Sequence, residues 1–212
     1  MKKKTEVITA TMDSEAVYDL ARLASAVKDN VSGRRFQHIT GVRYTAACMA
    51  MRYGENVNHA EACGLLHDYV KDFSDTKMLN QCRKHSLSIR PVEERNPYLL
   101  HGLLAAHLAE EEFGVTDHDL LNAIIYHTTG RPKMSQMEKI LFVADFMEPG
   151  RKPVPGLDDV RAMTFVDLDK AVLLELTATV GYLDECKESG KRAEIDERTI
   201  DAYRYYKEHV IL

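Results

Sequence analysis

Apolar residues recur at spacings of three and four along nearly the whole chain, and no stretch of strand length alternates strictly between apolar and polar positions. This spacing is typical of helices with one buried face, so it predicts an all-α fold. The expected helices cover residues 14–28, capped by Ser14, then 35–54, 58–73, 77–85, 96–114, 117–129 and 135–148, followed by a C-terminal pair that begins near 155, breaks near 188–191 and ends with 196–210.

The chain contains no internal repeat, low-complexity tract or linker rich in Pro, Gly and Ser. Its 212 residues are enough to bury a substantial core. We therefore expect a single domain over 1–212, with its core at about 34–175 and the C-terminal helices at 176–212 packed on that core.

Charge and cysteine usage argue against several classes of partner. The 28 Lys and Arg against 33 Asp and Glu give a formal net charge of -5, which does not suit a nucleic acid as the main partner. The four cysteines include no CxxC pair, so neither a disulfide framework nor a thiolate zinc site is indicated. The first residues lack the apolar region of a signal peptide, and no apolar run approaches the ~20 residues of a membrane span. We expect a cytoplasmic protein without a membrane partner; a homodimer is compatible with all of this.

The candidate functional residues are histidines and aspartates that interrupt apolar helical faces. A lone histidine on such a face is usually a core residue, but a buried carboxylate without a cation is costly, and Asp68 and Asp145 both lie between apolar neighbours. Imidazole and carboxylate together suit iron, manganese or zinc. The sequence therefore predicts a metal site from five helices, formed by His38, His67, Asp68, His101, His127 and Asp145.

His67 and Asp68 are adjacent, and adjacent side chains diverge by roughly 100° on a helix. Both can contribute to one site only if that site lies between the directions in which the two side chains point. A pair of metal ions bridged by Asp68 would meet this condition. Two such ions lower the pKa of a shared water and make it a nucleophile near neutral pH. The remaining histidines are not expected to join this site; they are His59, His85, His107, His118 and His209.

The order of the six candidate ligands resembles the metal signature of the HD superfamily of phosphohydrolases, and the intervening His101 and His127 resemble its dinuclear branch. Longer segments, among them RFQHITGV, LLHDYVKD, HTTGRPKMS and ADFMEPGR, are similar to the bacterial YqeK family of symmetrical diadenosine tetraphosphate hydrolases, over about residues 34–173. The resemblance implies an HD-domain helical bundle and two iron ions. It also implies that a metal-activated hydroxide attacks a central phosphate of the dinucleotide and yields two ADP.

Basic residues beside the candidate ligands are expected to bind phosphates. Lys71 follows His67 and Asp68 by one helical turn, so it shares their face. We expect Lys71 and Asp68 to be catalytic, with Lys71 stabilising charge on the attacked phosphate. Arg35 and Arg151 flank other ligands, and a guanidinium suits two phosphate oxygens. The alternative for each basic residue is a solvated surface role.

Other expected substrate contacts come from loops. Thr129 has a hydroxyl beside His127 that suits bonding near a ligand. Gly190 and Lys191 belong to ESGKR, which we expect to close over the nucleotide although it lacks the upstream glycine and the Ser or Thr of a phosphate-binding P-loop. Glu148 is expected either to orient a ligand or to lie exposed.

Two other functions are compatible with these residues. One is an HD-type phosphohydrolase that acts on a nucleoside mono- or triphosphate, which would leave His101 and His127 without a role. The other is a non-catalytic nucleotide sensor, which would be expected to lose ligands, whereas all six positions carry competent side chains.

Overall fold

The computed structural model describes residues 16–189 and 194–211, and these residues form α-helices and one short 3-10 helix, with no strand among them. The all-α prediction is confirmed. No helix in this described part is long and apolar enough to cross a membrane. The elements are α1 (Leu20–Asn30), α2 (Gly33–Tyr53), α3 (Val57–Leu66), α4 (Asp75–Lys84), α5 (Pro91–Arg95), η1 (Pro97–Leu100), α6 (His101–Phe113), α7 (His118–Tyr126), α8 (Gln136–Met147), α9 (Leu157–Met163), α10 (Leu168–Glu188) and α11 (Glu197–His209).

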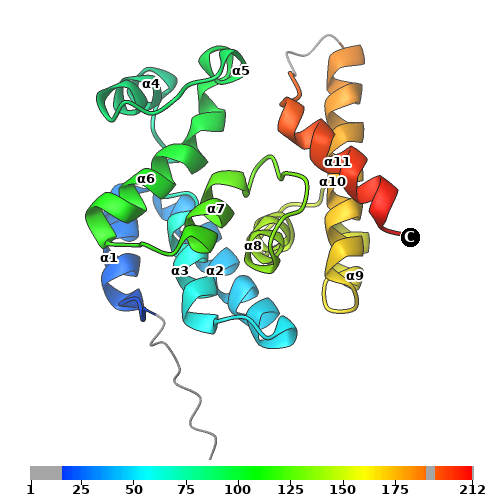
Figure 1. Cartoon of the computed structure of the whole chain (residues 1–212), viewed down its shortest axis with the longest axis horizontal. Helices are drawn as coiled ribbons and strands as arrows, with labels where there is room; N and C mark the ends of the chain where they lie inside the picture. Colours follow the sequence, from blue (N-terminus) through cyan, green and yellow to red (C-terminus); the bar gives the residue numbers. More distant parts are fainter. Residues whose placement is uncertain (1–15, 190–193, 212) are drawn as a thin grey trace, which may run out of the picture.

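The centre of the bundle is built where α2 packs on α3 and α8, and where α7 packs on α6 and α8. Figure 1 shows α8 near the middle, with α10 and α11 on one side and α4, α5 and α6 on the other. Each central helix contributes a side chain that is almost completely shielded from solvent; examples are Ile39, Leu65, Leu104, Ile124 and Leu141. This shared core fixes the helices that carry the six candidate ligands.

Two glycines allow these helices to approach closely. A Cβ at Gly64 in α3 would lie 2.5 Å from the Cα of Arg43 in α2. A Cβ at Gly102 in α6 would lie 2.7 Å from the carbonyl oxygen of Ile124 in α7. Because glycine has no Cβ, backbone meets backbone at both crossings, and each crossing lies within three residues of a candidate ligand.

The prediction of one helix over 58–73 is wrong beyond Leu66. From His67 onward the chain forms tight turns, in which the amide of Lys71 donates to the carbonyl oxygen of Asp68 at 3.0 Å. Nδ1 of His67 donates to the carbonyl oxygen of Gly64 at 2.8 Å, and that oxygen is the one an α-helix would offer to the amide of Asp68. The side chain of His67 therefore competes with the next backbone amide for this carbonyl oxygen, and the helix ends where the candidate site begins.

Other helix ends also differ from the predicted ones. α1 begins at Leu20 with Asp19 as its N-cap, and the predicted cap Ser14 lies outside the described residues. The expected helix at 96–114 is split into η1 and α6, and the five-residue α5 was not predicted. The C-terminal pair is in fact three helices, because α9 ends before α10 begins.

Candidate metal centre

The structure brings all six predicted ligands together around the carboxylate of Asp68. Its Oδ2 lies 3.5 Å from Nε2 of His67 and 3.6 Å from Nε2 of His38. Its Oδ1 lies 3.3 Å from Nε2 of His101 and 3.7 Å from Nε2 of His127. The two oxygens of one side chain therefore face two different pairs of histidines.

Asp145 adds a second carboxylate to one of these pairs. Its Oδ1 lies 3.1 Å from Nε2 of His38 and 3.9 Å from Nε2 of His67. In the other pair, the Nε2 atoms of His101 and His127 are 3.0 Å apart. The cluster thus has two halves with Asp68 between them, which is the arrangement that a bridged pair of metal ions requires.

Hydrogen bonds at the far side of each ring orient the four histidines. Nδ1 of His67, His101 and His127 lies 2.8, 2.5 and 2.7 Å from the carbonyl oxygen three residues earlier in the chain. A carbonyl oxygen only accepts, so each Nδ1 carries the hydrogen and each Nε2 turns a lone pair to the cluster. Nδ1 of His38 lies 3.2 Å from Oε1 of Glu148, which is buried, so the expectation that Glu148 lies exposed is wrong.

Several nitrogen and oxygen atoms at the centre of the cluster lack a hydrogen-bond partner among the described residues. Nε2 of His38, Nε2 of His67 and Oδ1 of Asp68 are buried and accept or donate no hydrogen bond within the described part of the chain. Unpaired buried polar atoms are costly. Imidazole nitrogens and carboxylate oxygens are ligands for divalent transition metals, so these residues fit a metal centre.

Burial and charge also set the protonation of the rings. Burial lowers the pKa of His67 and of His101, and the nearby Lys71 ammonium lowers that of His101 further. Both rings are therefore neutral and can donate a lone pair. Burial would lower the pKa of His38 too, but the adjacent carboxylates of Asp145, Asp68 and Glu148 outweigh burial and raise it.

The carboxylates remain ionised. Burial opposes the ionisation of Asp68, but the surrounding imidazoles and Lys71 outweigh it and hold its pKa well below the usual range. The pKa of Asp145 is lowered against the same opposition from burial, by His38 and Arg151. One buried and one half-buried negative charge lie side by side here and create an electrostatic demand for cations.

The three predicted basic residues lie at the cluster. Nζ of Lys71 lies 3.0 Å from Nε2 of His101. Arg35 donates to Oδ2 of Asp68 at 2.7 Å, and Arg151 donates to Oδ1 of Asp145 at 3.0 Å. Each of the three basic side chains therefore contacts a candidate ligand directly. Their role toward phosphates stays a prediction.

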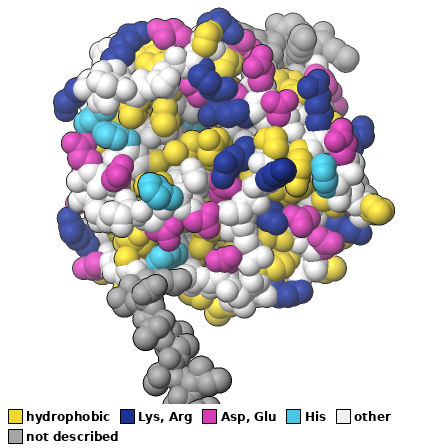
Figure 2. Space-filling view, in the orientation of Figure 1, with side chains coloured by type: hydrophobic (Ala, Val, Ile, Leu, Met, Phe, Trp, Pro, Cys, Tyr) yellow, Lys and Arg dark blue, Asp and Glu magenta, His cyan; other side chains and the backbone are white. Residues whose placement is uncertain are grey.

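A cavity of about 600 Å³ opens beside His38 and is basic, because Arg34, Arg35, Arg151 and Lys152 line it. On the face drawn in Figure 2, charged side chains of both signs are interspersed, and several Lys and Arg side chains lie near the middle beside hydrophobic ones. The cavity offers space next to the candidate metal ligands in which anionic groups would meet positive charge.

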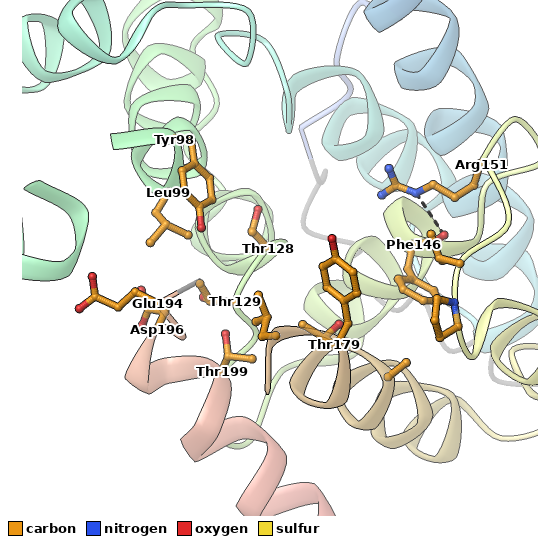
Figure 3. Close-up of a pocket in the computed structure, with 15 residues that line it drawn as sticks. Tyr98, Leu99, Thr128, Thr129, Phe146, Arg151, Thr179, Glu194, Asp196 and Thr199 are labelled. Carbon is orange, nitrogen blue, oxygen red and sulfur yellow. Dashed lines mark hydrogen bonds between the residues drawn. The ribbon is translucent and has the colours of Figure 1, made fainter. Parts of the chain in front are cut away.

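A second cavity of about 400 Å³ is mainly apolar and aromatic (Figure 3). Tyr98, Phe146 and Tyr182 line it together with Thr129, and it shares Arg151 with the basic cavity. These aromatic residues were not predicted from the sequence, since an aromatic side chain at helical spacing looks like a core residue. The expected contacts Gly190 and Lys191 lie outside the described residues.

The fold and the cluster define an HD domain: the family model described as HD domain matches residues 35–150. A crystal structure from Clostridium acetobutylicum, described as that of a predicted HD superfamily hydrolase involved in NAD metabolism, superimposes with a TM-score of 0.83 at 34% identity, covering 92% of this chain and 100% of that one.

Curated relatives narrow the assignment. A protein from Halalkalibacterium halodurans is 39% identical over 74% of this chain and 83% of its own length, and one from Bacillus subtilis is 36% identical over 75% and 84%. Both are named bis(5'-nucleosyl)-tetraphosphatase, symmetrical. The chain belongs to this family, the YqeK family of HD domain proteins.

Proposed function

We propose that this protein hydrolyses diadenosine tetraphosphate symmetrically, into two ADP, at a pair of metal ions. The relatives named above support the reaction. The observation that carries the proposal is the carboxylate of Asp68, whose two oxygens face separate pairs of histidines.

In this proposal His38, His67 and Asp145 would hold one metal ion, His101 and His127 would hold the other, and Asp68 would be shared by both. When bound, such a pair supplies water of lowered pKa and positive charge for a phosphate oxygen. We propose iron as the metal, on the resemblance to the YqeK family; the same donors also suit manganese and zinc. A cytoplasmic location and a homodimer remain predictions.

The chain's own residues bind and orient the tetraphosphate. Lys71 is the proposed catalytic cation, because its ammonium already lies 3.0 Å from the ring of His101. Arg35 and Arg151 are paired with Asp68 and Asp145, so they are held at the cluster and can bind phosphate oxygens once cations neutralise those carboxylates.

Two cavities beside one cluster suit a substrate with two nucleoside ends. The basic cavity and the aromatic cavity share Arg151 and Val154. We propose that the phosphate chain passes Arg151, while the aromatic cavity, with Tyr98 and Tyr182 in its wall, receives one adenosine by stacking and apolar contact. A mononucleotide would fill only one of the two spaces.

Chromatography of the products tests this proposal. The metal-loaded protein is incubated with dinucleoside polyphosphates of different length and with mono- and triphosphates. We expect ADP as the sole nucleotide product of diadenosine tetraphosphate. AMP plus ATP in equal amounts would contradict symmetrical cleavage, release of phosphate only from mononucleotides would favour the nucleotidase alternative, and binding without turnover would favour a sensor.

A further inference from the structure

A second group of metal-ligating side chains lies between α4 and α6, apart from the central cluster. His85 is the C-cap of α4, and His107 and Glu111 are one turn apart on α6. Six residues separate His107 from the central ligand His101, which corresponds to about 9 Å along the helix axis. The group therefore cannot share an ion with the central cluster.

The three donor atoms of this group already lie close together. Nδ1 of His85 is 2.9 Å from Nε2 of His107. Oε2 of Glu111 is 3.4 Å from Nδ1 of His85 and 3.6 Å from Nε2 of His107. The three atoms thus form a nearly equilateral triangle with a carboxylate oxygen at one corner.

This triangle has the size of one face of a tetrahedral zinc site. With bonds of ~2.1 Å, two ligand atoms of a tetrahedral ion are ~3.4 Å apart. The observed edges scatter around that value, so an ion slightly above the plane would reach all three atoms without movement of the backbone. Two imidazoles and one carboxylate, with a fourth position open to water, form a recurrent zinc donor set.

The surroundings leave that fourth position accessible. The side chains of His85 and His107 are 14% and 28% exposed, whereas that of Glu111 is 54% exposed. His85 and Glu111 line a groove of about 410 Å³ that also contains Lys77, Lys84 and Glu112. Nζ of Lys77 lies 3.2 Å from the ring centre of Phe73, so its charge has its own partner. The end of α4 also favours a cation, since the helix dipole places partial negative charge at a helix C-terminus.

We propose that His85, His107 and Glu111 form a separate mononuclear site for a borderline divalent cation, with Zn²⁺ as the best fit. Mg²⁺ and Ca²⁺ are excluded by their preference for oxygen ligands. The bound ion ties α4 to α6, the helix that begins at His101. This inference is independent of the proposed hydrolase activity.

Zinc binding to the whole protein tests the site. After chelation and dialysis, we expect the wild type to bind one more Zn²⁺ per chain than His107→Gln. We expect Glu111→Gln to weaken this extra site at least tenfold in competition with a chromophoric chelator. Glu110→Gln, an exposed neighbour on α6, is the matched control and should bind as the wild type does.

A second measurement separates zinc binding from a folding defect. Zn²⁺ should raise the unfolding temperature of the wild type and of Glu110→Gln more than that of Glu111→Gln, whose exposed side chain can be changed without disturbing the core. Equal zinc stoichiometry and affinity in the wild type, His107→Gln and Glu111→Gln would overturn the proposal.

Discussion

Asp68 supplies the charge that both halves of the cluster share. Its burial makes an uncompensated carboxylate costly, so the side chain and the cations stabilise one another. We expect Asp68→Asn, which keeps the shape but removes the charge, to lose both metal ions and all hydrolysis. Metal content and turnover are measured on the same preparation. Asp75→Asn is the control, because Asp75 is an exposed carboxylate in the first turn of α4. Two ions retained in Asp68→Asn would show that the carboxylate does not bridge.

Lys71 has a different expected role, toward the substrate. Its ammonium lies beside His101 but is not itself a metal ligand, so Lys71→Ala should keep both ions. We expect kcat to fall by the equivalent of roughly 2–4 kcal/mol, the usual cost of removing one donor from developing charge. Lys77→Ala, an exposed lysine six residues later, is the control. An unchanged kcat would place Lys71 outside the chemistry.

Glu175 on α10 gives a prediction about stability and pH. Burial raises the pKa of this carboxyl well above its usual value, Asp145 raises it further, and Arg151 opposes both. With a folded pKa above the unfolded ~4.3, the carboxyl contributes stability that is fully present below the unfolded value and is lost as pH rises toward the folded one. Glu175→Gln removes that loss.

We therefore expect Glu175→Gln to be more stable than the wild type at pH 8, by about 1.4 kcal/mol for each unit of raised pKa, with a smaller difference at pH 5. Urea unfolding at the two pH values measures this. Glu110→Gln, at an exposed residue of α6, is the control. A variant equally destabilised at both pH values would contradict the assignment.

The candidate metal ligands could be predicted from residue type, whereas the groups that surround them could not. Asp68 and Asp145 stand out because each interrupts an apolar run. The backbone carbonyl groups that orient the rings of His67, His101 and His127 cannot be identified from the sequence, since every residue has a backbone carbonyl. The contact between His38 and Glu148 joins residues 110 apart, so only the folded chain reveals which expectation for Glu148 holds.

Helix crossings determine the two halves of the centre. Gly102 lets α6 approach α7, where His101 and His127 meet. A Cβ there would lie 2.7 and 2.9 Å from two carbonyl oxygens of α7, so Gly102→Ala must separate the helices. We expect metal content to fall from two ions to one and the free energy of unfolding to fall by about 1–3 kcal/mol.

Gly181→Ala is the matched control, because its added Cβ meets no atom within 4 Å beyond its chain neighbours and the local backbone of α10. Alanine is the better helix former by about 1 kcal/mol, so this variant should be slightly more stable and keep both ions. Loss of metal in both variants, or in neither, would contradict the role of the α6 and α7 crossing.

Helices were easier to predict than their ends. Apolar spacing locates α2, α7 and α8 to within a few residues, because each buries a continuous face. The end of α3 was missed because the ring of His67 takes the carbonyl oxygen of Gly64, and five-residue α5 is too short to show a period.

At the scale of the whole molecule, the C-terminal helices complete the aromatic cavity. Tyr182 of α10 lies in its wall, and so does Thr199 of α11 (Figure 3). Ion pairs attach this region to α5: Arg90 pairs with Asp196, and Arg198 donates to Glu93 at 2.8 Å. Such contacts across about a hundred residues are set by packing, so the sequence predicted C-terminal helices on the core without predicting the cavity they close.

The position of water attack tests the central claim, that the cluster around Asp68 directs hydrolysis to a central phosphate. Diadenosine tetraphosphate is hydrolysed in ¹⁸O-labelled water, and the products are separated and analysed by mass spectrometry. We expect ADP alone, with one label on the terminal phosphate of half of the ADP molecules. Label in AMP would contradict the account, because it would place the attacked phosphate next to adenosine. Label in ATP would contradict it as well, because AMP and not ADP would then be the leaving group.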